Sequence, residues 1–237
     1  MNYAIILSGG VGTRLGLDLP KQYYEVNGKS VIQYVIETIE KHELLDGYVI
    51  VAAVEWRDFI SEIVKKVQNK EKTSKLGFIG FANPGENRQL SIYQGLLALK
   101  GIAQEEDLVL VQDAARANTS MELISKCLTI DTKEDGAMPV LPMKDTVYLS
   151  RDGKQVDELL KREQIFAGQA PESFRFGKYL QANEVLLPDK ILQINGSSEP
   201  AVMAGMRVAL IDGEESNFKI TTKADLERFC ALMAKDM

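Results

Sequence analysis

Short apolar runs alternate with amphipathic stretches along most of this chain, and this alternation limits the folds that it can adopt. The apolar runs lie at residues 3–7, 48–54, 78–81, 108–111, 137–141 and 207–211. Their length and aliphatic composition are typical of strands buried on both faces of a sheet. Between them, apolar residues recur every three or four positions over 31–39, 59–67 and 92–99, which predicts helices.

The alternation predicts an α/β fold in three layers, with a mostly parallel, mixed and twisted sheet between helices. Ser30 and Thr222 stand as N-caps before two of the helices, with Asp225 at the third position of the last one. Because the chain has no internal repeat or Pro/Gly-rich linker, we expect a single domain over 1–237. Ligands of such folds bind beyond the carboxyl ends of the strands.

Composition excludes several classes of function. The chain has 237 residues and a net charge of −6, which argues against a generic nucleic-acid binder. Its one histidine, His42, excludes a Ser/His/Asp triad or a poly-His metal centre, and we expect it to be a solvated residue at a helix end. Its two cysteines form no CxxC pair, which indicates a reducing compartment. The sequence shows no membrane span and no signal peptide, so we expect a cytoplasmic protein.

One segment interrupts the alternation. Residues 145–159 place Asp152-Gly153 between two extended stretches, and this dipeptide favours a tight hairpin turn because both residues tolerate positive φ. An isolated two-stranded ribbon is barely stable in water. We therefore expect the hairpin to pack either on another subunit or back on its own domain.

The first predicted strand runs directly into a glycine-rich loop, Ser8-Gly9-Gly10-Val11-Gly12-Thr13-Arg14-Leu15-Gly16. Glycines let main-chain N–H groups approach phosphate oxygens closely. The spacing matches neither the dinucleotide fingerprint, because Leu15 stands where glycine is required, nor a P-loop. Pro20 disfavours a helix at Leu19, so the chain stays extended up to Lys21. Arg14 and Lys21 are then two cations on one loop, unless this is an ordinary turn with solvated basic residues.

Several motifs together resemble one enzyme family. Residues 7–14, followed by Pro20-Lys21-Gln22, are similar to the opening of the nucleoside-triphosphate pyrophosphorylases. The Pro-Lys-Gln form most resembles the cytidylyltransferases of 2-C-methyl-D-erythritol 4-phosphate and D-ribitol 5-phosphate. Further motifs follow in the family's order: PGENRQLS (84–91), QDAAR (112–116), PVLPMKDT (139–146), KRE (161–163), QAPESF (169–174) and NFKITT (217–222). The resemblance spans residues 3–226.

The resemblance implies a CTP site with a set of positively charged catalytic residues. The residues implied to bind the nucleotide are Leu7, Ser8, Gly9, Gly10, Gly12, Gly85, Glu86, Asn87, Arg88, Ser91, Asp113 and Ala114. Asp113 would also bind Mg²⁺, which prefers one or two carboxylates plus phosphate oxygens, unless it caps the next turn instead. Arg14 and Lys21 would stabilise the transition state. Arg162 and Lys219 would hold the phosphate of the acceptor.

The chain departs from the family pattern at three positions. Gln112 replaces a histidine and Ala117 a proline, and we expect both changes to affect packing around the loop more than the carboxylate of Asp113. Ala170 replaces a threonine, so a hydroxyl contact to the substrate phosphate is lost there.

These observations predict an enzyme that transfers CMP from CTP to a sugar-alcohol phosphate, either ribitol 5-phosphate or 2-C-methyl-D-erythritol 4-phosphate, and releases pyrophosphate. The resemblance implies a Rossmann-like nucleotidyltransferase fold, a protruding β-arm at about 145–162 that forms a homodimer, and a place in isoprenoid or teichoic acid synthesis. It implies neither nucleic acid nor membrane as a partner. The alternatives are a uridylyl- or thymidylyltransferase acting on a sugar 1-phosphate and a non-catalytic nucleotide-binding regulator. The joint presence of Arg14, Lys21 and Lys219 disfavours the regulator.

Overall fold

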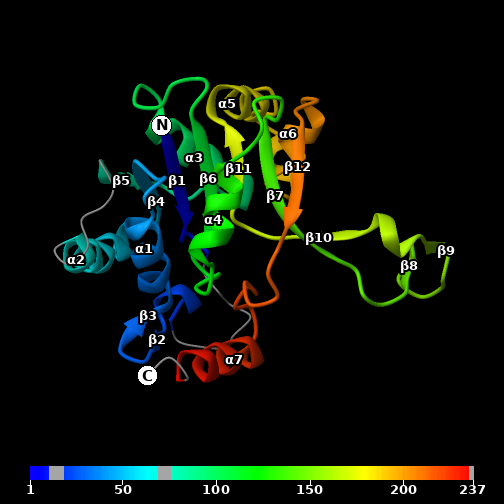
Figure 1. Cartoon of the computed structure of the whole chain (residues 1–237), viewed down its shortest axis with the longest axis horizontal. Helices are drawn as coiled ribbons and strands as arrows, with labels where there is room; N and C mark the ends of the chain where they lie inside the picture. Colours follow the sequence, from blue (N-terminus) through cyan, green and yellow to red (C-terminus); the bar gives the residue numbers. More distant parts are fainter. Residues whose placement is uncertain (11–18, 69–75, 235–237) are drawn as a thin grey trace.

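The computed structural model describes residues 1–10, 19–68 and 76–234 and contains one large mixed sheet (Figure 1). Neighbouring strands follow the order β10-β7-β11-β6-β1-β4-β5, and β12 pairs with β7. The strands of this sheet are β1 (Asn2–Leu7), β4 (Gly47–Val51), β5 (Gly77–Ala82), β6 (Leu108–Asp113), β7 (Gly136–Pro142), β10 (Phe166–Gly168), β11 (Glu172–Arg175) and β12 (Val208–Asp212).

Most strand pairs of the sheet are parallel, as the sequence predicts. β1 runs parallel to β4 on one side and to β6 on the other, and β4–β5 and β7–β12 are parallel too. β10 and β11 are antiparallel to their neighbours. In the β1–β6 register Leu7 lies opposite Asp113, so these two strands end side by side.

Helices cover both faces of the sheet, which confirms the three-layer prediction (Figure 1). Alternate residues of β1 point to opposite faces: Ile6 packs in the cluster that contains residues of α1, α2, α4 and α7, and Ile5 in the cluster with α3, α5 and α6. The helices are α1 (Val31–Lys41), α2 (Arg57–Gln68), α3 (Arg88–Leu99), α4 (Met121–Leu128), α5 (Phe176–Glu184), α6 (Glu199–Met203) and α7 (Lys223–Met233). Short 3-10 helices are η2 (Lys21–Tyr23), η3 (Val54–Trp56), η4 (Arg162–Gln164) and η5 (Lys190–Gln193). None of the described helices is both long enough and apolar enough to cross a bilayer.

The two predicted N-caps differ in what their side chains do. Thr222 Oγ1 accepts a hydrogen bond from the Asp225 N–H, and Asp225 Oδ2 accepts one from the Thr222 N–H, which completes a capping box on α7. Ser30 does precede α1, but its side chain makes no capping hydrogen bond. Position alone therefore identified the start of α1, and the capping interaction itself was predicted correctly only for α7.

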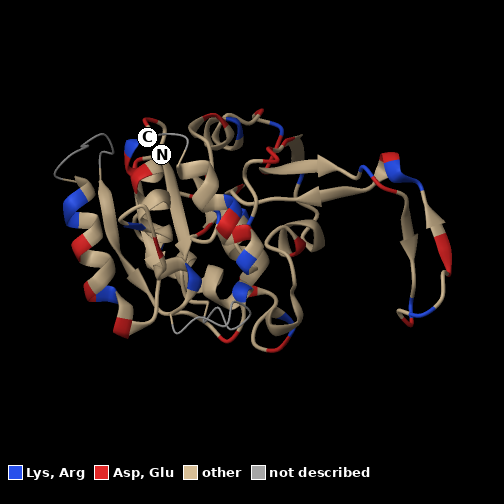
Figure 2. Ribbon diagram, turned by 90° about the horizontal axis from the view of Figure 1, so that it is seen from below, with Lys and Arg blue, Asp and Glu red and all other residues tan. Residues whose placement is uncertain are grey.

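A two-stranded arm projects from one side of the body (Figures 1 and 2). It consists of β8 (Val147–Leu149) and β9 (Glu158–Leu160), which pair antiparallel. The hairpin predicted around Asp152-Gly153 is present, but its connection is longer than the tight turn that this dipeptide favours: residues 150–157 form a loop in which Asp152 Oδ1 accepts the N–H groups of Lys154 and Gln155. Gly153 has the expected positive φ of 69°. A second small ribbon, β2 (Glu25–Val26) with β3 (Lys29–Ser30), precedes α1.

The structure also corrects two expectations about burial. His42 is buried, with its Nε2 atom 3.1 Å from both Met121 O and Ser125 Oγ, so it joins the end of α1 to α4 and is not solvated. β12 is not buried on both faces: Leu210 is 51% exposed, and among the described strands β12 pairs with β7 alone, at the edge of the sheet.

One strand boundary also differs from the prediction. The strand predicted over 48–54 ends at Val51.

Candidate active site

A cavity of about 450 Å³ opens where β1 and β6 end. From β1 the chain continues to β4 and β5 on one side and later returns to β6 on the other, so the cavity lies at a topological switch point, where α/β sheets bind ligands. The predicted site residues that line it are Leu7, Gly9, Gly10, Lys21, Gly85, Glu86, Asn87, Arg88, Ser91, Asp113, Ala114 and Lys219.

The remaining predicted residues do not line this cavity or cannot be placed. Gly12 and Arg14 lie outside the described residues. Ser8 is buried beside the cavity, where its hydroxyl pairs with Tyr23 Oη at 3.0 Å. Arg162 lies at the base of the arm and donates to Lys144 O at 2.8 Å, so within one chain it is not part of the cavity.

Asp113 holds the cations of the cavity together. Its Oδ1 accepts from Arg88 Nε and Nη2 at 3.1 and 3.0 Å, and its Oδ2 lies 2.8 Å from Lys219 Nζ and 3.9 Å from Arg116 Nε. Burial alone would raise the pKa of Asp113, but these cations, Arg88 first, hold it well below its usual range. The carboxylate is therefore ionised at neutral pH and fixes the positions of three positive groups.

Gln22, the residue after Lys21, binds the start of the glycine loop, residues 8–10. Gln22 is buried, and its Nε2 donates to the carbonyls of Ser8 and Gly10 at 2.9 and 2.7 Å. A Cβ on Gly9 would lie 2.5 Å from Pro84 Cβ, so the lack of a side chain at Gly9 allows the backbone there to pack against Pro84. The glutamine of the Pro-Lys-Gln motif thus shapes the start of the loop, a role that the sequence analysis did not assign.

Two polar side chains of the 84–91 segment, Asn87 and Ser91, hold its own turn in shape. Asn87 caps α3 by accepting the Leu90 N–H at 2.8 Å, and its Nδ2 donates to Ile191 O. Ser91 Oγ accepts the Gly85 N–H at 3.0 Å and donates to Asn87 O. These side chains line the cavity while holding the segment in shape, and Arg88 is the member that presents a charge to Asp113.

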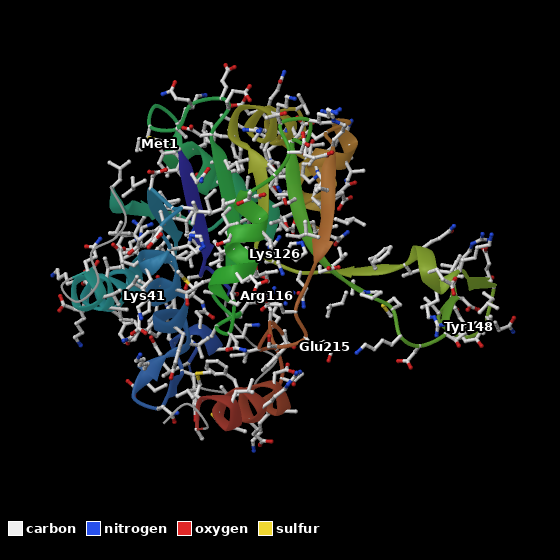
Figure 3. All side chains as sticks on the ribbon, in the orientation of Figure 1. Met1, Lys41, Arg116, Lys126, Tyr148 and Glu215 are labelled. Atoms are coloured by element: carbon white, nitrogen blue, oxygen red, sulfur yellow. The ribbon has the colours of Figure 1, made fainter. Side chains whose placement is uncertain are left out.

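Sequence reasoning missed one basic residue of the site. Arg116 donates from Nη1 to Asn217 O. Its Nε approaches Oδ2 of Asp113, whereas Arg88 binds the other carboxylate oxygen, Oδ1. It lies in the middle of the body, between the ends of the parallel strands and α7 (Figure 3). The signal was present, because Arg116 belongs to the QDAAR motif, but a spacing of three residues from Asp113 does not show that the two side chains meet.

A family model described as 2-C-methyl-D-erythritol 4-phosphate cytidylyltransferase matches residues 2–235. The chain belongs to this family. This membership confirms the resemblance given by the motifs, the fold class and the assignment as a nucleotidyltransferase enzyme. The alternative of a sugar 1-phosphate enzyme from another group is not supported.

Curated relatives of this cytidylyltransferase family member carry two different names. The chain is 30% identical to ribitol-5-phosphate cytidylyltransferase of Streptococcus agalactiae serotype III over 98% of its own length and 95% of that protein's. It is also 30% identical to 2-C-methyl-D-erythritol 4-phosphate cytidylyltransferase of Geobacter metallireducens, over 94% of each protein. Among solved structures, 4-diphosphocytidyl-2C-methyl-D-erythritol synthase of Anaerococcus prevotii superposes with a TM-score of 0.80 at 25% identity, covering 98% of this chain and 96% of the other.

Proposed function

We propose that this enzyme transfers the cytidylyl group of CTP to the phosphate of ribitol 5-phosphate or 2-C-methyl-D-erythritol 4-phosphate. The observation that carries the proposal is the convergence of Lys21, Arg88 and Lys219 on one cavity at the end of β1 and β6. The names of the relatives support the nucleotide and the two acceptors. The QAP form of residues 169–171 favours ribitol 5-phosphate as the first acceptor to test.

The proposed reaction requires charge neutralisation more than proton transfer. An oxygen of the acceptor phosphate, already ionised at neutral pH, forms a bond to the α-phosphorus of CTP, and the bond from that phosphorus to the β-phosphate breaks to release pyrophosphate. Catalysis then consists of bringing two anions together and stabilising the negative charge on the phosphorus. Fixed cations in a cavity supply both effects, and the one histidine is held between α1 and α4, where it takes no part.

Within this reaction we assign each cation a separate task. Lys21 and Arg14 stabilise the transition state, Arg88 with Gly85 and Ser91 lies around the nucleotide, and Lys219 holds the acceptor phosphate. Asp113 orients Arg88 and Lys219 through ion pairs of 3.0 and 2.8 Å. Phosphates entering the cavity would share these cations with Asp113.

We propose that a magnesium ion binds in the cavity together with the nucleotide, where it would share Asp113 with Arg88 and Lys219. Asp113 and Glu86 are the two carboxylates among the described residues that line the cavity, and the described part of the chain has no cluster of three or more His, Cys, Asp or Glu side chains suited to a metal. Mg²⁺ typically takes one or two carboxylates plus substrate phosphates and water. We propose Asp113 as its protein ligand, and the ion would neutralise charge on the triphosphate.

We further propose that the arm of β8 and β9 joins two copies of the chain. Tyr148 and Leu159 lie opposite each other on the two strands and are 57% and 61% exposed, an apolar pair that no described part of the chain covers. Tyr148 lies at the far end of the arm (Figure 3). Arg162 at the arm's base would then reach the acceptor site of the partner.

The proposal is tested by measuring pyrophosphate release with each of the four ribonucleoside triphosphates, in the presence of ribitol 5-phosphate or 2-C-methyl-D-erythritol 4-phosphate. We expect release with CTP and with one of the two acceptors, and a dependence on added Mg²⁺. Release that is equally fast with all four nucleotides, or independent of either acceptor, would contradict the proposal.

A further inference from the structure

Three buried polar side chains form a hydrogen-bonded chain behind the cavity, and the reaction described above gives them no role. Gln112 lies on β6, Thr119 in the turn after it and Asn217 between β12 and α7, with exposures of 0%, 8% and 0%. Gln112 Nε2 donates to Thr119 Oγ1 at 3.0 Å, and Thr119 Oγ1 lies 2.9 Å from both Asn217 Oδ1 and Arg116 O, which share its single proton. We call these three residues the brace.

The brace connects two parts of the chain that carry the charges of the cavity. At one end Gln112 directly precedes Asp113, and at the other end Asn217 lies two residues before Lys219. Asn217 also accepts a hydrogen bond from Arg116 at its backbone carbonyl, and its Nδ2 donates to Ala170 O at 2.8 Å. Lys219 and Arg116 both approach Asp113 Oδ2, and both are linked to the backbone of Asn217, Arg116 by its hydrogen bond to the carbonyl and Lys219 along the chain.

The segment that carries Lys219 is attached to the body at several points, among them Glu214 Oε1, which accepts from Ser120 Oγ, and Ser216 O, which accepts from Asn118 Nδ2. Residues 213–222 belong to no helix or strand. Gln169 binds the backbone of Glu214 at 2.9 and 3.0 Å, and the Ile220 N–H donates to Ala115 O at 2.8 Å. Between these two attachments, Asn217 supplies the fully buried side chain that fixes the backbone. The ion pair with Asp113 fixes the ammonium group of Lys219, and that contact requires the Lys219 backbone to stay within reach of the end of β6.

We infer that the brace is a positioning device for the acceptor phosphate: it fixes the backbone of Lys219 against the end of β6, so that the ammonium group meets the acceptor beside Asp113. This inference rests on the proposed function, in which Lys219 holds that phosphate. Gln112, Thr119 and Asn217 are positioning residues, because they act through Lys219 and Arg116 and do not themselves line the cavity. A site that must hold its groups within a fraction of an ångström depends on such supporting contacts.

The inference is tested with Thr119→Val, which keeps the shape of the side chain and removes the hydroxyl in the middle of the brace. We expect the KM for the acceptor phosphate to rise about tenfold, a modest loss of binding, because Lys219 is still present but less firmly placed. The KM for CTP should change less than about twofold. Thr119→Ser keeps the hydroxyl and should restore the acceptor KM. Thr38→Val is the matched control, because Thr38 makes its side-chain hydrogen bond to Tyr34 O within α1.

A second variant covers the case in which Thr119→Val does not fold. Gln112→Met conserves volume and removes the amide that donates to Thr119. It also removes Oε1, a buried atom with no hydrogen-bond partner among the residues that the structure describes. We expect the same selective rise in the acceptor KM. An acceptor KM unchanged in both variants, or equally raised in Thr119→Ser, would overturn the inference.

A double-mutant cycle distinguishes this inference from the proposed function. If Thr119 acts through Lys219, then Thr119→Val should have little further effect on the acceptor KM in a Lys219→Met background. The same cycle can be measured on the urea unfolding midpoint, which does not require an active enzyme. We expect non-additive effects there as well, because the contact of Lys219 with Asp113 contributes to stability only where the brace is intact. Additive effects of Thr119→Val and Lys219→Met would overturn the inference. If the wild-type protein is inactive but the two substitutions have non-additive effects on unfolding, only the proposed function is contradicted.

Discussion

Asp113 shows how a single residue sets the electrostatics of an acidic protein's cavity. The chain carries a net charge of −6, which opposes the binding of a triphosphate and a phosphomonoester. Around Asp113, however, Arg88, Arg116 and Lys219 outnumber the carboxylate, so the local charge is positive. The carboxylate of Asp113 therefore positions these cations without neutralising their combined positive charge.

At the residue scale, His42 predicts a loss of stability in mild acid. Burial lowers the pKa of His42, against an opposing effect of its hydrogen bond to Met121 O, so the folded state favours the neutral ring. The unfolded chain takes up a proton near pH 6.5, which means that the contribution is present above about pH 6.5 and is lost progressively below it. We expect the urea midpoint to fall more between about pH 7.5 and pH 5 in the wild type than in His42→Gln. Equal falls in the two proteins would contradict this.

His42 and Asn87 also show what local sequence can reveal about single residues. The charged neighbours of His42 predict exposure, and the atoms that bury it come from α4, 79 residues away. Asn87 instead caps α3 through Leu90, three residues on, which is a local interaction that the sequence does carry. Assigning Asn87 to the nucleotide therefore overlooked a structural role.

At the scale of one element, the capping box of α7 predicts a measurable contribution to stability. Thr222→Ala removes the oxygen that accepts the Asp225 N–H, and we expect it to lower the free energy of unfolding by about 1 kcal/mol. Ser30→Ala at the start of α1 is the matched control, because Ser30 makes no capping bond and its Oγ has no partner. Urea unfolding of both variants tests this, and an equal loss in the two would refute it.

The parallel core of the sheet was predictable from the sequence, and its antiparallel strands were not. Buried apolar runs separated by helices require parallel crossover connections, which accounts for β1, β4, β5 and β6. β10 and β11 are only three and four residues long, and β11 lies between β6 and β7. Their direction follows from tertiary pairing, which short local patterns do not contain. The motif residues, in contrast, largely line one cavity because the ends of adjacent parallel strands meet there.

At the scale of the whole molecule, the arm predicts that assembly and acceptor binding are linked. Leu159→Asp places a charge on the exposed apolar pair of the arm, and we expect it to convert a dimer into a monomer in analytical ultracentrifugation and to raise the acceptor KM. Arg162→Ala should raise the acceptor KM far more than the KM for CTP and leave the dimer intact. A Leu159→Asp protein that stays dimeric, or an Arg162→Ala protein in which the KM for CTP changes most, would contradict this role of the arm.

The central claim is that fixed cations of the cavity promote phosphoryl chemistry, and Lys21→Ala tests it most directly. We expect CTP-dependent pyrophosphate release with the preferred acceptor to fall by about 10²–10³-fold, the usual cost of losing one group that stabilises a transition state, while cooperative thermal unfolding is retained. Lys126→Ala, which removes a surface ion pair with Glu122 on α4, should leave the rate unchanged. Near-normal release by a folded Lys21→Ala enzyme would contradict the account.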